Sequence, residues 1–341
     1  MRMRMVAVAF GPSTMAEACD GLPRIRGVAD CVELRLDHFE EPFDLNVLLR
    51  ERGELPVVAT LRPPDQGGRC NMPAEQRLEI LVRAAELGAE YVDLEWDAAT
   101  VAAQAAVRAA GARVIISRHD FSEMPAELAD VWWSELAAQG ADVVKVVGTA
   151  HDLRDCLTVF RALRRADRPT IAIGMGAAGL LTRVLGLRAE QCLLTYAALE
   201  TGGGTAPGQL TVDDLRQTYR VQRLGPSTRV FGLLGPHEER ERLVEYNAWF
   251  EAEASDGVAV PFSTTSNAAA IVTAFRELPV SGWHIHGGDL QKDAVQVMDE
   301  LDGTATQQAK VNAIVRQADG GLTGHWVESP RQQFELWRGA A

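Results

Sequence analysis

Lys145 combines a nucleophilic side chain with a setting that could activate it. It stands in Asp142-Val143-Val144-Lys145-Val146-Val147-Gly148, a run typical of a buried parallel strand. Loss of hydration disfavours an ammonium group, so burial makes the neutral amine available to attack a carbonyl carbon and form a Schiff base. The alternative is a lysine near a strand end whose charged group reaches water along its own aliphatic stem.

Further apolar runs also carry polar and reactive side chains. These side chains lie within the runs near their ends, or a few residues beyond them. Arginine can hold a carboxylate through two parallel hydrogen bonds, and histidine transfers protons near neutral pH. If the runs are parallel strands of one barrel, their carboxyl ends meet at one mouth. Such a mouth would suit a small anionic carbonyl compound. The set comprises Glu33 and Arg35, Arg62, His119, Met175 with Arg183, and Thr205 with Gln209.

The elements that must position these residues alternate between strands and helices. Eight such units in about 220 residues is the number and size of a (β/α)8 TIM barrel. An open doubly wound sheet is the second choice, disfavoured because no Gly-x-Gly-x-x-Gly follows the first run. Gly88, Gly111 and Gly140 close three amphipathic stretches, as expected at helix C-termini. Strands are predicted at 5–10, 31–37, 56–62, 91–96, 113–119, 143–148, 170–175 and 193–196, and helices at 74–87, 98–110, 126–139 and 152–164.

The overall composition indicates a soluble globular protein. Of 341 residues, 47% are hydrophobic and 24% charged, and the net charge of −13 without a Lys/Arg tract argues against a nucleic-acid partner. No apolar run approaches the roughly 20 residues of a membrane span. Gly11-Pro12-Ser13 ends the first apolar run too early for a signal peptide. Five scattered cysteines without Cys-x-x-Cys indicate reduced thiols, no zinc site and a cytoplasmic location.

Several segments around these residues resemble type I 3-dehydroquinate dehydratase, the shikimate-pathway enzyme of aromatic amino acid and chorismate biosynthesis that uses a Schiff-base lysine. The resemblance covers about residues 1–222 in the family's order. Its most specific pieces are His-Asp-Phe at 119–121, the lysine, and Ala-Pro-Gly-Gln at 206–209. The other matches are Val32-Glu33-Leu34-Arg35-Leu36-Asp37, Thr60-Leu61-Arg62, Gly67-Gly68, Gly174-Met175-Gly176 and Leu181-Thr182-Arg183.

The resemblance implies a TIM barrel over residues 1–224 that converts 3-dehydroquinate to 3-dehydroshikimate and water, a hydro-lyase reaction without metal or cofactor. Lys145 would form the imine with the C3 ketone. His119 would take the C2 proton and later protonate the departing C1 hydroxyl. The other family positions would bind substrate: Arg183 its carboxylate, Glu33, Arg35 and Arg62 its hydroxyls and ring face, and Gln66, Met175, Thr205 and Gln209 the remaining walls and the closing loop.

Two of these positions depart from the family pattern. Gln66, preceded by Asp65, stands where the family usually has the glutamate that holds the catalytic histidine. An amide can hydrogen-bond the ring but cannot stabilise an imidazolium as a carboxylate does, so we expect weakened activity. Thr205 replaces a serine of the closing loop and keeps the hydroxyl, beside the glycines of 202–204, which suit a mobile lid or a plain flexible linker.

Residues 228–341 resemble the substrate-binding domain of shikimate dehydrogenase, as in fused dehydratase–dehydrogenase proteins. The functional motifs are eroded: Glu238–Arg242 replaces a serine-rich motif, Glu328 replaces an aspartate, and Lys292 stands at an altered spacing. The matches are Phe231-Gly232-Leu233-Leu234-Gly235, Tyr246-Asn247-Ala248-Trp249-Phe250, Val260-Pro261-Phe262, Val311-Asn312-Ala313 and Asp319-Gly320-Gly321-Leu322-Thr323-Gly324.

This second domain is expected to lack dehydrogenase activity. The chain ends at Ala341 before an NADP-binding Rossmann domain could follow. Its elements are predicted as strands at 229–234, 257–262, 282–286, 309–316 and 322–326, and helices at 239–253, 267–278 and 289–301. His284, His286 and Asp289 are interpreted as structural residues, without a metal.

Two other functions stay open beside the dehydratase. One is a pseudoenzyme that senses a metabolite of the shikimate or quinate pathway, as fungal quinate repressors resemble shikimate-pathway enzymes. Lys145 and His119 favour the enzyme, while Gln66 and the eroded second domain favour the sensor. The other is an aldolase-like Schiff-base barrel, which the His-Asp-Phe and closing-loop matches disfavour. A homodimer also stays open.

Overall fold

The computed structural model describes residues 4–200, 209–265, 267–278 and 280–339. The chain divides into two compact units, one formed by Met1–His151 with Thr158–Leu215 and the other by Asp152–Leu157 with Arg216–Ala341. The first holds an eight-stranded sheet and the second a six-stranded sheet.

The eight-stranded sheet is a closed parallel barrel, as predicted. Its strand order is β7-β6-β5-β4-β3-β2-β1-β8, and β1 pairs in parallel with both β2 and β8. A parallel bridge between Thr170 and Cys192 joins β7 to the start of the β8 segment, which closes the ring and excludes the open sheet. The strands are β1 (Met5–Phe10), β2 (Cys31–Arg35), β3 (Val57–Thr60), β4 (Tyr91–Glu95), β5 (Arg113–His119), β6 (Val143–Thr149), β7 (Thr170–Met175) and β8 (Leu194–Ala197).

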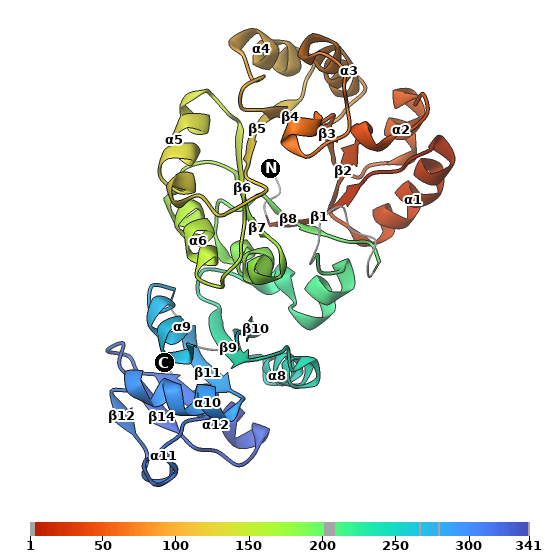
Figure 1. Cartoon of the computed structure of the whole chain (residues 1–341). Helices are drawn as coiled ribbons and strands as arrows, with labels where there is room; N and C mark the ends of the chain where they lie inside the picture. Colours follow the sequence, from red (N-terminus) through yellow and green to blue (C-terminus); the bar gives the residue numbers. More distant parts are fainter. Residues whose placement is uncertain (1–3, 201–208, 266, 279, 340–341) are drawn as a thin grey trace. The chain divides into compact units, whose positions relative to one another are not determined.

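Helices follow the strands and lie outside the ring (Figure 1). Thr14 caps the first helix by accepting the backbone N–H of Glu17, and Thr100 caps α4 in the same way. Gly88 and Gly140 have φ of 101° and 96° two residues after the last residue of α3 and of α5, the left-handed conformation that ends a helix. The helices are α1 (Met15–Val28), α2 (Leu45–Glu51), α3 (Ala74–Glu86), α4 (Val101–Ala109), α5 (Val131–Ala138), α6 (Asp155–Arg165) and α7 (Leu180–Leu185).

The barrel interior is apolar in its lower layers and charged near the carboxyl ends of the strands. Inward-facing residues such as Met5, Val58, Ile115 and Ile171 form one buried hydrophobic cluster. On β3 and β5, the buried positions two residues further along are polar, at Thr60 and Ser117, whereas β1 and β7 stay apolar there. Because side chains alternate between the two faces of a strand, this step of two residues keeps the polar groups inside the barrel.

The second unit is a mixed sheet in the order β10-β9-β11-β13-β14-β12. Its first three strands are parallel, and β13 runs antiparallel to both β11 and β14. Its elements are β9 (Arg229–Gly235), α8 (Arg240–Ala252), β10 (Gly257–Ser263), α9 (Ala268–Ala274), β11 (Val280–Ile285), α10 (Gly288–Asp293), β12 (Glu300–Leu301), α11 (Gly303–Gln308), β13 (Ala313–Arg316), β14 (Leu322–His325) and α12 (Pro330–Gly339).

The prediction of one helix over 289–301 is wrong, and the strand predicted at 309–316 begins only at Ala313. Helix α10 ends at Asp293, and residues 300–301 form β12, which pairs in parallel with β14. Asp302 then caps the unpredicted helix α11 by accepting the N–H of Ala305 at 2.6 Å. Between α10 and β12 the chain passes through a short 3-10 helix, Ala294–Val297, a division that periodicity alone does not indicate.

Among the described residues, no helix is both long and apolar enough to cross a membrane.

Candidate active site

A cavity of about 120 Å³ lies at the carboxyl ends of the barrel strands and collects nearly all the residues singled out from the sequence. Thr205 lies outside the described residues. The lining consists of Ala9, Glu33, Arg35, Arg62, Gln66, Gly67, His119, Phe121, Lys145, Val147, Ile173, Met175, Arg183, Tyr196 and Gln209.

Lys145 is buried in β6, but its amine is not in apolar surroundings. The side chain is 4% exposed, and Nζ donates to Asp93 Oδ2 at 2.7 Å and to Glu33 Oε1 at 3.2 Å. The expectation of an amine in purely apolar surroundings is therefore incomplete, because two carboxylates contact its nitrogen. These carboxylates can stabilise the positive charge that a protonated imine carries.

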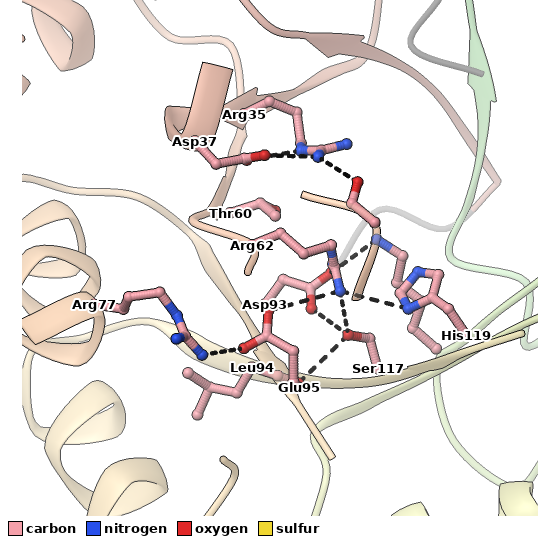
Figure 2. Close-up of polar contacts among 12 residues, drawn as sticks. Arg35, Asp37, Thr60, Arg62, Arg77, Asp93, Leu94, Glu95, Ser117 and His119 are labelled. Atoms are coloured by element: carbon pink, nitrogen blue, oxygen red, sulfur yellow. Dashed lines mark hydrogen bonds and ion pairs between the residues drawn. The ribbon is translucent and has the colours of Figure 1, made fainter. Parts of the chain in front are cut away.

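Arg62 joins the carboxylates of the barrel to the predicted proton-transfer residue. Its Nη2 donates to Asp93 Oδ2 at 2.7 Å, and its Nη1 lies 3.4 Å from His119 Nδ1 (Figure 2). Burial opposes the charge of Arg62, but the neighbouring carboxylates of Asp93 and Glu95 raise its pKa. Arg62 is thus a fixed cation, and it holds one edge of the imidazole.

His119 ends β5 and is set up as a neutral imidazole. Burial lowers its pKa well below the ordinary value, and the cations Arg62 and Lys145 lower it further. The ring of Phe121 stacks on it, with centroids 5.6 Å apart and planes within 4°. Phe121 itself is 49% exposed at the mouth of the barrel. A neutral ring held on one edge and one face can accept a proton at physiological pH.

Arg183 is a buried guanidinium that forms no ion pair with a carboxylate of the described residues. It is 1% exposed, and burial lowers its pKa to about 10. Its contact within the described residues is a weak 3.5 Å hydrogen bond to the carbonyl of Tyr196, and its Nε is buried without a hydrogen-bond partner. A carboxylate entering the cavity would satisfy this guanidinium.

The remaining predicted residues differ in how they are held. Arg35 is tied to Asp37 by two hydrogen bonds of 2.9 and 2.8 Å. Met175 packs against the hydrophobic cluster of the barrel. The amide oxygens of Gln66 and Gln209 are buried without a hydrogen-bond partner among the described residues, so both are available to a ligand.

Three buried polar residues of the site were missed from the sequence: Asp93, Glu95 and Ser117. Asp93 and Glu95 alternate on β4, and Ser117 Oγ donates to Asp93 Oδ1 at 2.5 Å. Figure 2 shows Arg77, Glu95, Arg62 and Asp93 as a connected set of charges. The signal was the same as for Glu33 and Arg35, two charges spaced by two residues in an apolar strand.

The histidines of the second unit contact protein groups. His284 Nδ1 lies 2.8 Å from the hydroxyl of Tyr246, and His286 Nδ1 lies 3.3 Å from Glu239 Oε1. Asp289 is fully exposed and forms a loose 3.8 Å pair with Lys292. The described residues contain no group of three or more His, Cys, Asp or Glu side chains arranged to hold a metal ion.

Comparisons with known proteins point to one family. The family model described as type I 3-dehydroquinase matches residues 6–226. The 3-dehydroquinate dehydratase of Methanopyrus kandleri is 36% identical over 197 residues, which cover 57% of this chain and 87% of that protein. The chloroplastic bifunctional 3-dehydroquinate dehydratase/shikimate dehydrogenase of Arabidopsis thaliana is 32% identical over 305 residues, which cover 87% of this chain. The chain spans half the length of this bifunctional relative.

Solved structures support the fold. The 3-dehydroquinate dehydratase of Geobacillus kaustophilus is similar with a TM-score of 0.58 and 23% identity, over 62% of this chain and 88% of that one. The dehydroquinate dehydratase and shikimate dehydrogenase of S. pombe AroM gives a TM-score of 0.53 and 24% identity, over 95% of this chain and 65% of that one. Since the second match covers nearly the whole chain, the likeness extends into the second unit.

Proposed function

The chain belongs to the type I 3-dehydroquinase family, and on that premise we propose that its barrel removes water from 3-dehydroquinate through a Schiff base at Lys145. One observation carries the proposal. A buried amine, a neutral imidazole and a buried guanidinium without a carboxylate partner among the described residues line a single cavity. These are the nucleophile, the base and the anion-binding group that the reaction requires.

Substrate binding in this proposal starts from Arg183. Its buried guanidinium attracts the substrate carboxylate, which supplies hydrogen bonds that the described residues do not give this side chain. The amide of Gln209 lines the same cavity, its oxygen accepts no hydrogen bond from the described residues, and it meets a substrate hydroxyl. This orientation places the C3 ketone toward Lys145 and the C2 hydrogen toward His119.

The imine then acts as an electron sink. Lys145 Nζ adds to C3, and the ketone oxygen leaves as water, giving a protonated imine. His119 removes the proton from C2, and the electron pair of that C–H bond forms an enamine. The enamine expels the C1 hydroxyl, which takes a proton from His119 and leaves as water. A further water molecule hydrolyses the imine, releases 3-dehydroshikimate and restores the lysine.

Formation of the enone product from 3-dehydroquinate tests this function. The absorbance of the conjugated enone should increase with time and with protein concentration. Binding of 3-dehydroquinate without turnover would instead support the metabolite sensor, and the absence of both binding and turnover would contradict either function.

Replacing Gln66 with glutamate should raise turnover and move the pH profile. A carboxylate beside His119 would stabilise the imidazolium and raise the pKa that burial and Arg62 now lower. The neutral ring is the base, so the acid limb of kcat/KM should move to higher pH by about one unit. Profiles of kcat/KM against pH for both proteins measure this.

Asp65→Asn is the matched control, because Asp65 is the exposed neighbour of Gln66. It should leave the profile unchanged. If Gln66→Glu leaves the profile unchanged while Asp65→Asn alters it, Asp65 already serves His119.

We also propose that the second unit does not oxidise shikimate. The bounds proposed for the two domains are 1–224 and 228–341. In the second, Lys292 is 61% exposed beside Asp289, and Glu328 stands where the related domain has aspartate. Of the groups expected to hold shikimate, the aspartate is therefore replaced, and the lysine stands at an altered spacing with its side chain in solvent.

Purified protein with shikimate and NADP should accordingly produce no NADPH, while an authentic shikimate dehydrogenase does so in the same assay. Saturable NADPH formation would overturn this proposal without affecting the dehydratase.

A further inference from the structure

Asp93 is a buried carboxylate that the reaction scheme above leaves without a role. It lies on β4 with 0% exposure, and one of its oxygens, Oδ2, receives two cations. Lys145 Nζ and Arg62 Nη2 are each 2.7 Å from this oxygen. Ser117 Oγ donates to the other oxygen at 2.5 Å, so the orientation of the carboxylate is fixed. Arg62 and Lys145 together lower the pKa of Asp93 against the effect of burial, which keeps it ionised.

Glu33 differs from Asp93 although it contacts the same amine. Its Oε1 is 3.2 Å from Lys145 Nζ and also accepts a 2.7 Å hydrogen bond from Thr60 Oγ1. Glu33 lines the cavity, whereas Asp93 is not among the lining residues. The amine therefore lies between one carboxylate that faces the substrate space and one that is enclosed by protein.

After imine formation, the nitrogen of Lys145 can donate a strong hydrogen bond to only one of these two carboxylates. A lysine ammonium has three N–H donors and can serve Asp93 and Glu33 together. When the neutral amine adds to a ketone and the oxygen leaves as water with the required protons, the resulting protonated imine has one N–H and a full positive charge. That single donor can keep one strong hydrogen bond, and the nearer, fully buried partner is Asp93.

We propose that Asp93 is the counter-ion of the Lys145 iminium and that imine formation releases Glu33 toward the substrate hydroxyls. The inference rests on the proposed Schiff-base function and assigns the two carboxylates different tasks. Asp93 keeps the nitrogen protonated, which the electron sink requires. Arg62 also donates to Oδ2 of Asp93. This contact weakens the attraction between Asp93 and the iminium charge, so electrons can flow into the imine.

The test is trapping of the imine with cyanoborohydride, which reduces the protonated imine, as a function of pH. With 3-dehydroquinate present, wild-type labelling should persist into alkaline buffer. In Asp93→Asn, the pH at which labelling falls to half should drop by at least about one unit, a tenfold loss of protonated imine at a given pH. Circular dichroism and the melting temperature establish that the variant is folded.

Glu33→Gln is the matched control, since it removes the other carboxylate that contacts Nζ. It should raise KM and leave the trapping profile in place. An unchanged profile in folded Asp93→Asn, or an equal shift in Glu33→Gln, would overturn the assignment.

If Asp93→Asn does not fold, the wild-type protein provides an independent test of the proposal. With ¹⁵N at the lysine side chain, the imine nitrogen should remain protonated in mildly alkaline buffer. A neutral imine nitrogen there would overturn the proposal. Absence of any labelling in the wild type would instead contradict the proposed function, so the two failures are distinguishable.

Discussion

Replacement of Lys145 with methionine is expected to reduce dehydration by on the order of 10⁴–10⁶-fold, the range seen when a covalent nucleophile is removed from an enzyme whose binding groups remain. Methionine has a similar length and is apolar, so the barrel interior stays filled. The expected loss is chemical: without the amine there is no imine to accept the electrons of the C2–H bond. The rate of enone formation at saturating 3-dehydroquinate measures it.

The chain offers matched controls because it contains three lysines, Lys145, Lys292 and Lys310. The other two belong to the second unit. Lys292→Met and Lys310→Met should retain wild-type rates. Wild-type turnover by Lys145→Met would show that the barrel uses another nucleophile or none.

Replacement of His119 with asparagine should reduce turnover by about 10²–10⁴-fold, the usual contribution of a general acid–base group. Asparagine keeps a polar group near Arg62 but has no titrating nitrogen. The pH profile of the remaining rate should also lack the acid limb, because that limb comes from protonation of the imidazole. The imine should still form, because the amine of Lys145 is untouched. Turnover and borohydride labelling, measured together over a range of pH, separate these steps.

His151→Asn is the control, since His151 lies on the barrel but does not line the cavity. It should leave both the rate and the pH profile unchanged. If His119→Asn turns over near the wild-type rate, another group removes the C2 proton.

The barrel was predictable because each of its signals is local. The run around Lys145 is apolar enough to require burial, and β1, β5 and β7 begin and end where their apolar runs do. The mouth followed from the rule that functional residues gather at the carboxyl ends of parallel strands. His119, Lys145 and Arg183 line one cavity although 64 residues separate the first from the last.

The environment of each side chain was less predictable because it depends on neighbouring strands. The expectation of an apolar setting for Lys145 considered β6 alone, and its true partners Asp93 and Glu33 come from β4 and β2. The helix prediction over 289–301 was wrong for a related reason, since β12 exists only through its pairing with β14. A few amphipathic residues do not specify that partner.

The domain bounds and the residue roles stay predictions. The division between compact units after Leu215 lies close to the family match that ends at residue 226. The assignment of Lys145, His119 and Arg183 to steps of the reaction rests on their geometry and on the chemistry of their side chains.

Identification of the reduced adduct by mass tests the central claim most directly. Wild-type protein is treated with 3-dehydroquinate and borohydride, digested and sequenced by mass spectrometry. The account predicts one ligand-sized mass on the peptide containing Lys145, absent without ligand and absent in Lys145→Met. Full labelling of Lys145→Met, or labelling of Lys292 or Lys310 in place of Lys145, would contradict it.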